Sequence, residues 1–478
     1  MSIRKQAISG VKWTTVSTVT LTVVNLLKIS VLARFLDKTD FGLMALVTFV
    51  LGFMDLFMDM GLTSAILHKQ KITKHEYSSL YWVNVVFSIA LVAIIIMLCP
   101  VIATFYKEPE LISLIPLMSL SIIFSALGRQ FRTIEQKALH FKYIGIIDII
   151  SSGIGLIIGV IMSVMGYGVY ALVFSSLSIF GVSNVIFLAN GLTTHGILLH
   201  FKFRETKPFL RIGLYQVGGQ IINYLNRDLD VLIIGKFFGT EILGGYSLAK
   251  QLVRRPLHII DPIITKVGIS IFPKYQNDHF ALRKYFSKLI NAQGSINAMV
   301  YGAIAILASY LVQIFYGNDF MSIVSYVQLF AMLVYLRSMG GIMAILVITT
   351  GRTDYEFYWN LITTLLMPIA IILGAMYSVV MIIILMTFVQ LIIFIPGWYM
   401  FYKRLINLEF LPFFKSNLYP ALISIGFVTL SLIIFKNNLF GEIFATILLV
   451  VTLFIYSYIA LDEVKEITNK TVRKYARF

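Results

Sequence analysis

The sequence predicts an all-α membrane protein that crosses the bilayer about fourteen times. Of its 478 residues, 58% are hydrophobic and only 13% are charged, whereas soluble proteins carry about 25% charged residues. The mean hydropathy is +0.86, and apolar runs of about 20 residues, the length of one membrane-spanning helix, follow one another along the chain. The net charge of +16 does not indicate nucleic acid binding, because no soluble domain is predicted to present a basic face.

The apolar runs place the spanning helices in order, with short connections between them. We expect helices near residues 10–35, 41–66, 77–103, 111–130, 145–166, 168–190, 209–235, 241–271, 289–315, 322–350, 357–376, 378–402, 417–435 and 440–461. The first run follows Arg4 and Lys5 but contains Lys12 and Lys28 and lacks a small-x-small cleavage site, so it is expected to remain as a helix. The single cysteine, Cys99, lies in an apolar run, forms no disulfide within the chain and is expected to be a small core residue.

Basic residues gather in alternate connections between the predicted helices. They are Lys69, Lys71, Lys74, Arg129, Arg132, Lys137, Lys142, Lys202, Arg204, Lys207, Lys274, Arg283, Lys284, Lys288, Arg352, Lys403, Arg404 and Lys415, followed by Lys465, Lys470, Arg473, Lys474 and Arg477 in the tail. The opposite connections hold little beyond Lys38, Lys107, Lys236 and Lys436. Because cytoplasmic loops are enriched in Lys and Arg, the even helix count predicts that both termini are cytoplasmic.

The two halves of the chain resemble each other at a constant offset of 202 positions. VNLLKISVLARFLDKTDFG (24–42) aligns with NRDLDVLIIGKFFGTEILG (226–244). The paired positions include Asn25 with Arg227, Lys28 with Asp230, Arg34 with Lys236, Phe35 with Phe237, Gly42 with Gly244 and Asp59 with Asp261. Each half therefore begins with a helix containing polar residues, a short outer turn and a second helix that carries an acid. Duplicated helical bundles with a binding site between them are a common transporter plan.

Three predicted helices carry polar residues at helical spacing, which places each set on one face. The sets are Thr14, Thr18, Asn25 and Lys28; then Gln216, Gln220, Asn223, Arg227 and Asp230; then Lys250, Arg254, His258 and Asp261. Charges inside a membrane almost always face a bundle interior or a wet cavity, and they mark a pathway. The structural alternative is that Arg227 pairs with Asp228 or Asp230 and holds two helices together.

The basic group of the eighth predicted helix points to an anion. Lys250, Arg254 and Arg255 outnumber the nearby acids, and with Lys28 and Arg227 they predict a cationic cavity. The predicted substrate-binding residues are Asn25, Lys28, Asn223, Arg227, Asp230, Lys250, Arg254 and Arg255. The sequence lacks a GxxxxGK[ST] loop, an HExxH motif and a large outer loop with paired carboxylates, so we expect no ATP hydrolysis, cofactor, metal or catalytic residue.

Several motifs carry a family resemblance. NRDLDVLIIGKFFGTEILGGYSLAKQLVRRP (226–256), FMDLFMDMGLTSAI (53–66), SSLYWVNVVFS (78–88), FYKEPEL (105–111) and LARFLDKTDFGLMAL (32–46) resemble the polysaccharide-exporter branch of the multidrug/oligosaccharidyl-lipid/polysaccharide flippase superfamily. Within it, the chain is most similar to the colanic-acid-exporter-like group. The motifs cover most of the first 280 residues, and the remainder matches by hydropathy.

The resemblance implies two pseudo-symmetric six-helix lobes around a central cavity, with two further helices. We expect the lobes at 1–200 and 201–405, and the added helices with a basic cytoplasmic tail at 406–478. It implies export of an isoprenoid-diphosphate-linked oligosaccharide across the bacterial inner membrane by alternating access. The expected partners are this lipid-linked substrate, membrane lipids and the polysaccharide polymerase and assembly proteins.

Since no nucleotide site is visible, an ion gradient is the expected energy source, and acids within the membrane are its expected carriers. The candidates are Asp55, Asp59 and Asp261. Asp59 also fits a structural role near the end of its helix, and flux drawn by polymerisation outside is an alternative to ion coupling.

Three other functions compete with oligosaccharide export. A multidrug exporter of the same superfamily usually handles organic cations, for which a cavity rich in Lys and Arg is a poor host. A membrane-embedded polysaccharide polymerase or ligase is disfavoured by the missing outer loop. A scaffold protein would not need three aligned polar faces.

Overall fold

The computed structural model describes residues 3–59, 63, 66, 67, 69, 72–435 and 438–460. The basic tail and Lys436, on which part of the predicted topology depends, lie outside the described residues. By its internal contacts the chain divides into two compact units, Met1–Ser247 and Leu248–Phe478. All regular structure among the described residues is helical.

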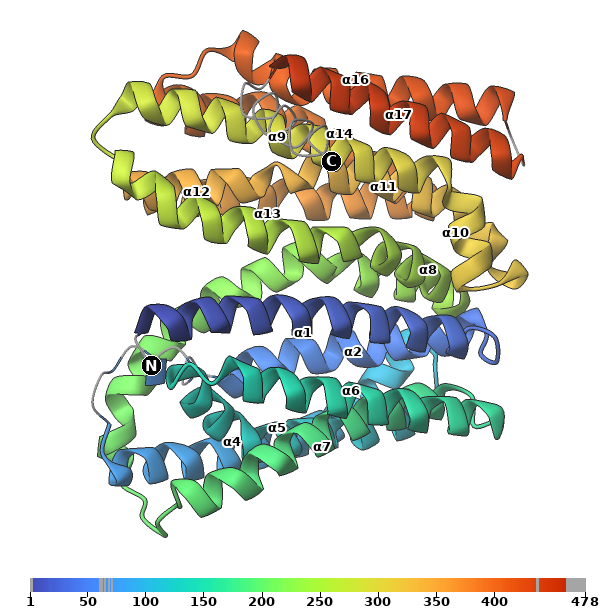
Figure 1. Cartoon of the computed structure of the whole chain (residues 1–478). Helices are drawn as coiled ribbons and strands as arrows, with labels where there is room; N and C mark the ends of the chain where they lie inside the picture. The colour runs from blue at the N-terminus through green and yellow to red at the C-terminus, as the bar shows by residue number, and fades with distance from the viewer. Residues whose placement is uncertain are drawn as a thin grey trace, which may run out of the picture. The chain divides into compact units, whose positions relative to one another are not determined.

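The first unit contains the helices that run from the N-terminus to the middle of the chain. They are α1 (Ile3–Leu32), α2 (Lys38–Asp59), α4 (Lys74–Tyr106), α5 (Leu111–Lys137), α6 (Phe141–Val164), α7 (Val169–Thr194) and the larger part of α8 (Phe203–Ile271). In Figure 1 helices α1, α2 and α4 to α7 lie beside one another, coloured from blue to green.

The second unit contains the end of α8 and all later helices. They are η1 (Phe272–Tyr275), α9 (His279–Ile306), α10 (Ala308–Phe315), η2 (Asn318–Ile323), α11 (Val324–Ser338), α12 (Gly340–Thr350), α13 (Thr353–Ala375), α14 (Val379–Gly397), η3 (Trp398–Lys403), α15 (Arg404–Ile406), α16 (Phe410–Ile434) and α17 (Leu439–Ala460). Of these, η3 is a π-helical turn that continues α14.

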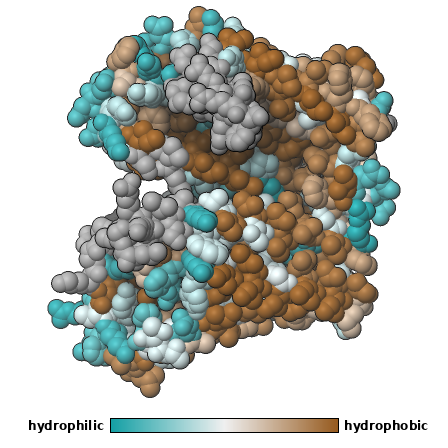
Figure 2. Space-filling model, in the orientation of Figure 1, coloured by the Kyte–Doolittle hydropathy of each residue, from teal (hydrophilic) through white to brown (hydrophobic). Residues whose placement is uncertain are grey.

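The predicted fold class is confirmed. Thirteen segments among the described residues are long and apolar enough to cross a membrane. One of them, Val217–Thr265, has 49 residues, which as a straight helix would be about 74 Å long, more than twice the ~30 Å hydrocarbon core. It is broken at Gly239, whose φ of 80° and ψ of 175° are not helical, so it contains two crossings, and the count rises to fourteen. In the face shown in Figure 2, hydrophobic side chains cover the flanks of the helices and hydrophilic ones gather toward their ends.

The beginnings of the two halves touch each other in the first unit with pseudo-two-fold symmetry. A Cβ atom added to Gly42 would lie 1.8 Å from the carbonyl oxygen of Thr240, and one added to Gly244 would lie 1.7 Å from that of Lys38. Under the offset of 202 positions, Lys38 corresponds to Thr240 and Gly42 corresponds to Gly244. Exchanging the two halves therefore turns one contact into the other, as at a two-fold interface. The first turn of α2 and the turn of α8 after Gly239 therefore pack backbone to backbone. We call these four residues the glycine seam.

The structure corrects the predicted ends of two helices. The sequence places Arg129, Arg132, Lys137 and Lys142 in a connection, but α5 continues to Lys137 and α6 begins at Phe141. The segment RQFRTIEQK consists mostly of residues with good helix propensity, and the helix ends only where Leu139 adopts a φ of 61°. Arg132 is therefore a helical residue, and Arg129 lies well inside the helix and not at its end.

Candidate functional site

The first unit contains an open polar cavity of about 700 Å³, which we call the N-unit cavity. Helices α1, α2, α5, α6, α7 and α8 contribute to its wall. The lining residues are Leu21, Asn25, Asp55, Leu56, Thr63, Ser125, Arg129, Arg132, Thr133, Gln136, Asp148, Ser151, Ser152, Ile179, Phe180, Ser183, Asn184 and Gln220. Most of these side chains are hydroxyl, amide or charged groups, so the cavity can hydrogen-bond a polar ligand inside a bundle whose outer surface is apolar.

The charged part of the cavity wall is built around α5. Both terminal nitrogens of the Arg132 guanidinium donate hydrogen bonds to the Asp148 carboxylate of α6, at 2.6 and 2.8 Å. This bidentate geometry is typical of arginine–carboxylate pairs. The guanidinium carbon also lies 5.5 Å from the ring centroid of Phe187 on α7. Three helices therefore hold the Arg132 side chain in one position.

A second pair lies one turn away on the same face of α5. Arg129 donates to Asp55 of α2 at 2.5 Å, and the Asp55 side chain is half exposed to the cavity. Arg129 is eight residues from the end of α5, or about 12 Å along the helix, and Asp148 is seven residues, about 10 Å, from the start of α6. Both pairs thus lie inside predicted membrane spans.

The sequence pattern could have found these residues. Ser125, Arg129, Arg132 and Gln136 step by four, three and four, and all line the N-unit cavity. This is the same one-face rule that selected the other polar sets. The predicted helix ends at residue 130, which leaves Arg132 and Gln136 outside it, and Arg129 is counted with the basic residues of the following connection.

The predicted residues of the first unit separate into two groups. Asn25 lines the N-unit cavity, where its side-chain amide donates to the carbonyl oxygen of Leu21 at 2.8 Å, and Asp55 lines it as well. Lys28 is half-buried on α1 and Asn223 is exposed on α8. Neither borders this cavity. The Gln216 side chain lies outside the described residues.

The charged side chains of the stretch NRDLD bond to other residues of the same helix, α8. The Arg227 Nε donates to Asp228 at 2.7 Å, and its guanidinium lies 5.3 Å from the centroid of the Tyr224 ring. Asp230 is 1% exposed and accepts hydrogen bonds from the Tyr246 hydroxyl at 2.5 Å and from the Val231 backbone at 3.0 Å. Asp230 therefore joins the two parts of α8 on either side of Gly239, and neither Arg227 nor Asp230 lines the N-unit cavity.

The remaining predicted residues lie in the second unit or outside the described part. Lys250 is buried, and Arg254 and Arg255 are half-buried on α8, with Arg255 in electrostatic range of Tyr316. Asp261 packs against α12, since a Cβ on Gly341 would lie 3.7 Å from its Oδ2, and its buried Oδ1 has no hydrogen-bond partner in the part of the chain that the structure describes. Asp59 ends α2, and its side chain lies outside the described residues. No group of three or more His, Cys, Asp or Glu that could hold a metal occurs among those described.

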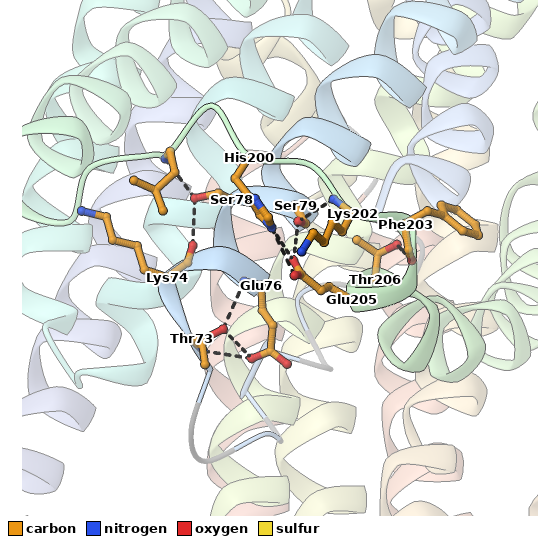
Figure 3. A network of polar contacts seen from close by, with 11 residues as sticks. Thr73, Lys74, Glu76, Ser78, Ser79, His200, Lys202, Phe203, Glu205 and Thr206 are labelled. Atoms are coloured by element: carbon orange, nitrogen blue, oxygen red, sulfur yellow. Dashed lines mark hydrogen bonds and ion pairs between the residues drawn. The ribbon is translucent and has the colours of Figure 1, made fainter.

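The segment between α7 and α8 is fastened to the start of α4 (Figure 3). The Ser79 hydroxyl donates to Glu205 Oε2 at 2.6 Å and accepts from the backbone of Lys202 at 3.1 Å. The Ser78 hydroxyl accepts from the backbone of Leu198 at 3.0 Å, and His200 Nε2 lies 3.1 Å from Glu205 Oε1. These bonds lower the pKa of the Glu205 carboxyl, chiefly through the Ser79 hydroxyl and then through His200.

This arrangement predicts a pH-dependent contribution to stability. A carboxyl with a lowered pKa in the folded state stabilises the fold above its ordinary value of 4.5 and loses that contribution as the pH falls through the lower, folded-state value. We expect Ser79→Ala to reduce the thermal midpoint most at neutral pH, and to reduce it less at a pH below the folded-state pKa of Glu205, where only the pH-independent bond to the Lys202 backbone is lost. Thermal unfolding of the purified protein across this pH range measures the difference. Ser178→Ala is the control, because the Ser178 hydroxyl bonds only its own helix, at Phe174. An equal effect of Ser79→Ala at every pH would contradict the assignment.

Fourteen candidate crossings in the described part of the chain, a polar cavity between the helices of one unit and an apolar exterior define a multi-pass membrane protein of the transporter type. The chain belongs to the polysaccharide biosynthesis protein family, whose model matches residues 31–325, and so to the polysaccharide-exporter branch of the multidrug/oligosaccharidyl-lipid/polysaccharide flippase superfamily. This membership places it with transporters and not with enzymes.

Several relatives match over most of the chain. Lipopolysaccharide biosynthesis protein WzxC of Escherichia coli (strain K12) is 29% identical over 432 residues, which cover 90% of this chain and 88% of that protein. Teichuronic acid biosynthesis protein TuaB of Bacillus subtilis (strain 168) is 26% identical over 428 residues, 88% of each chain.

Solved structures share the fold. The lipid II flippase MurJ in an inward closed conformation superimposes with a TM-score of 0.77 at 14% identity, covering 94% of this chain and 99% of that one. An inward-facing multidrug resistance transporter of the MATE family gives a TM-score of 0.64 at 15% identity, covering 80% and 94%. At these identities the similarity shows the fold alone.

Proposed function

We propose that the chain moves an isoprenoid-diphosphate-linked oligosaccharide across the bacterial inner membrane by alternating access. The observation that carries the proposal is the N-unit cavity, where hydroxyl and amide side chains line a space of about 700 Å³ between membrane-spanning helices. Such groups form the hydrogen bonds that sugar hydroxyls require, and the isoprenoid tail can stay in the lipid while the head group crosses. The relatives WzxC and TuaB are named as biosynthesis proteins of lipopolysaccharide and of teichuronic acid, which supports this class of substrate.

We also propose that both termini are cytoplasmic and that the chain consists of lobes 1–200 and 201–405 with added helices at 406–478. The alternation of basic connections supports the orientation. Reporter fusions after Lys107 are then expected outside the cell and fusions after Lys403 inside, and the opposite pattern would refute the orientation. Polymerase and assembly proteins are the partners that would receive the exported unit.

Ion coupling is part of the proposal, with Asp55, Asp59 and Asp261 as its candidates. Asp261 supports it best, because its buried Oδ1 has a vacant acceptor position among the described residues. A buried carboxylate oxygen of this kind costs free energy unless a proton or cation satisfies it. Replacing Asp261 with Asn is the corresponding variant for the transport assay below.

A transport assay in proteoliposomes tests the proposed function. The purified full-length chain is expected to move a fluorescent isoprenoid-diphosphate oligosaccharide between leaflets, and Asn184→Trp, which places a large ring in the N-unit cavity, is expected to stop it. Thr429→Trp is the matched control, because Thr429 is exposed on α16 outside this cavity. Efflux of an organic cation without movement of the lipid would instead identify a multidrug exporter.

A further inference from the structure

The charges that line the N-unit cavity cancel. Its described wall contains the cations Arg129 and Arg132 and the anions Asp55 and Asp148, and Arg129 pairs with Asp55 while Arg132 pairs with Asp148. The sequence predicts a cationic cavity made by other residues, whereas the charges of the described lining residues sum to zero. An anionic ligand therefore meets two arginines that are already paired with carboxylates, and both terminal nitrogens of Arg132 are engaged.

The occupied donors have the geometry of an anion site. Arg132 presents two parallel N–H groups to Asp148, and this fork matches phosphate oxygens as well as it matches a carboxylate. Arg129 and Arg132 are three residues apart on one helix, so their Cβ atoms are about 5–6 Å apart. Two adjacent phosphates of one diphosphate can therefore contact both guanidinium groups.

We propose that Arg129 and Arg132 form the diphosphate position of the cavity and that Asp55 and Asp148 are its built-in counter-ions, displaced when the ligand binds and returning to expel it. This proposal rests on the proposed function. The guanidinium groups stay neutralised in both states, by the acids when the cavity is empty and by phosphate when it is loaded, which avoids the large cost of an unpaired arginine within the membrane. A site with free arginines would bind a diphosphate tightly but would release it slowly.

The exchange also links ligand binding to helix packing. Asp55 is on α2, Asp148 is on α6 and both arginines are on α5. When phosphate replaces the carboxylates, α5 loses its ion pair with α2 and its ion pair with α6 at the same time. The displaced carboxylates then require positive charge from outside the pair, so a loaded cavity takes up a cation or proton together with the anion.

Binding of farnesyl diphosphate to the purified full-length chain in detergent tests the exchange. Asp148→Asn is expected to tighten binding by about ten-fold, because it leaves the Arg132 donors available to phosphate, and Arg132→Gln is expected to weaken it by about ten-fold. The double variant Arg132→Gln/Asp148→Asn leaves the charge balance of the cavity unchanged, and it is expected to lose the tighter binding that Asp148→Asn alone produces.

Three further ligands identify the source of the affinity. Farnesol tests the lipid, free diphosphate tests the phosphates, and glucuronic acid tests an acidic sugar. Arg352→Gln is the matched control, because Arg352 pairs with Asp354 outside the cavity.

The outcomes separate this inference from the proposed function. If the wild type binds farnesyl diphosphate and Asp148→Asn leaves its affinity unchanged or lower, the carboxylates are not competing counter-ions and the inference is overturned. If the wild type does not bind the diphosphate but transports the lipid-linked oligosaccharide, the phosphates bind elsewhere, and the inference again fails while the function stands. If the wild type neither binds nor transports, the proposed function fails with it.

Discussion

Gly244→Val is expected to destabilise the first unit more than any other change proposed for it. The Cβ atom at this position would lie 1.7 Å from the Lys38 carbonyl oxygen and 2.8 Å from the Gly42 backbone nitrogen. Backbone atoms of helices cannot move aside as a flexible side chain can, so the cost is expected at or above the ~1–3 kcal/mol typical of overpacked cores. A large fall in the thermal midpoint of the purified protein, or loss of the folded protein from the membrane, is the expected result.

The glycine seam supplies its own controls. Gly42→Val is expected to have an effect of similar size, because the two contacts are symmetry mates. Gly218→Val lies on the same helix as Gly244, but a Cβ there would meet nothing within 4 Å, so the thermal midpoint should change little. If valine were tolerated equally at Gly244 and Gly218, the close backbone approach would not exist in the membrane.

The sequence predicts that Arg254 and Arg255 bind the substrate, and on that proposal Arg254→Gln/Arg255→Gln is expected to reduce transport by about 100-fold or more, since each charged donor that contacts a ligand contributes about 1.5–3 kcal/mol. The two arginines are half-buried on α8 beside the buried Lys250, so this helix concentrates positive charge within a predicted span. The proteoliposome assay measures the transport rate, and quantification in the membrane measures the protein level, which is expected to stay near normal.

Surface lysines of the same unit provide the comparison for this variant. Lys274→Gln/Lys284→Gln removes the same amount of charge from exposed positions and is expected to leave transport unchanged. Loss of the Arg254/Arg255 variant from the membrane would mean that the arginines stabilise the second unit and do not contact substrate.

The number of crossings could be predicted from the sequence because the bilayer imposes one length on every helix. The short turn predicted after residue 235 is the break at Gly239, and the glycine there allows the positive φ that the break requires. Hydropathy failed at α5, where the helix extends past the apolar run. Polar residues beyond Gly128 can remain helical because they face a cavity inside the bundle and not the lipid.

The candidate site was harder to predict because its pairs join distant parts of the chain. Arg129 and Asp55 are 74 positions apart, and no local spacing relates them. The stretch NRDLD shows how a shared face leaves the contacts open. Arg227 pairs with Asp228, which is the structural alternative that the sequence allowed, and Asp230 bonds to Tyr246 beyond the break in α8. A helical pattern shows which residues share a face, but only the packing shows what that face contacts.

The glycine seam has a consequence for how a duplicated chain can diverge. Two copies of an ancestral segment are free to drift apart wherever each packs against its own surroundings, as Asn25 and Arg227 have done. At the seam each copy is part of the other's surroundings, so a bulkier residue in one copy obstructs both. The similarity between the two halves should therefore persist longest in the first turn of α2 and in the turn of α8 after Gly239. Relatives too distant to align elsewhere should still match in these two turns.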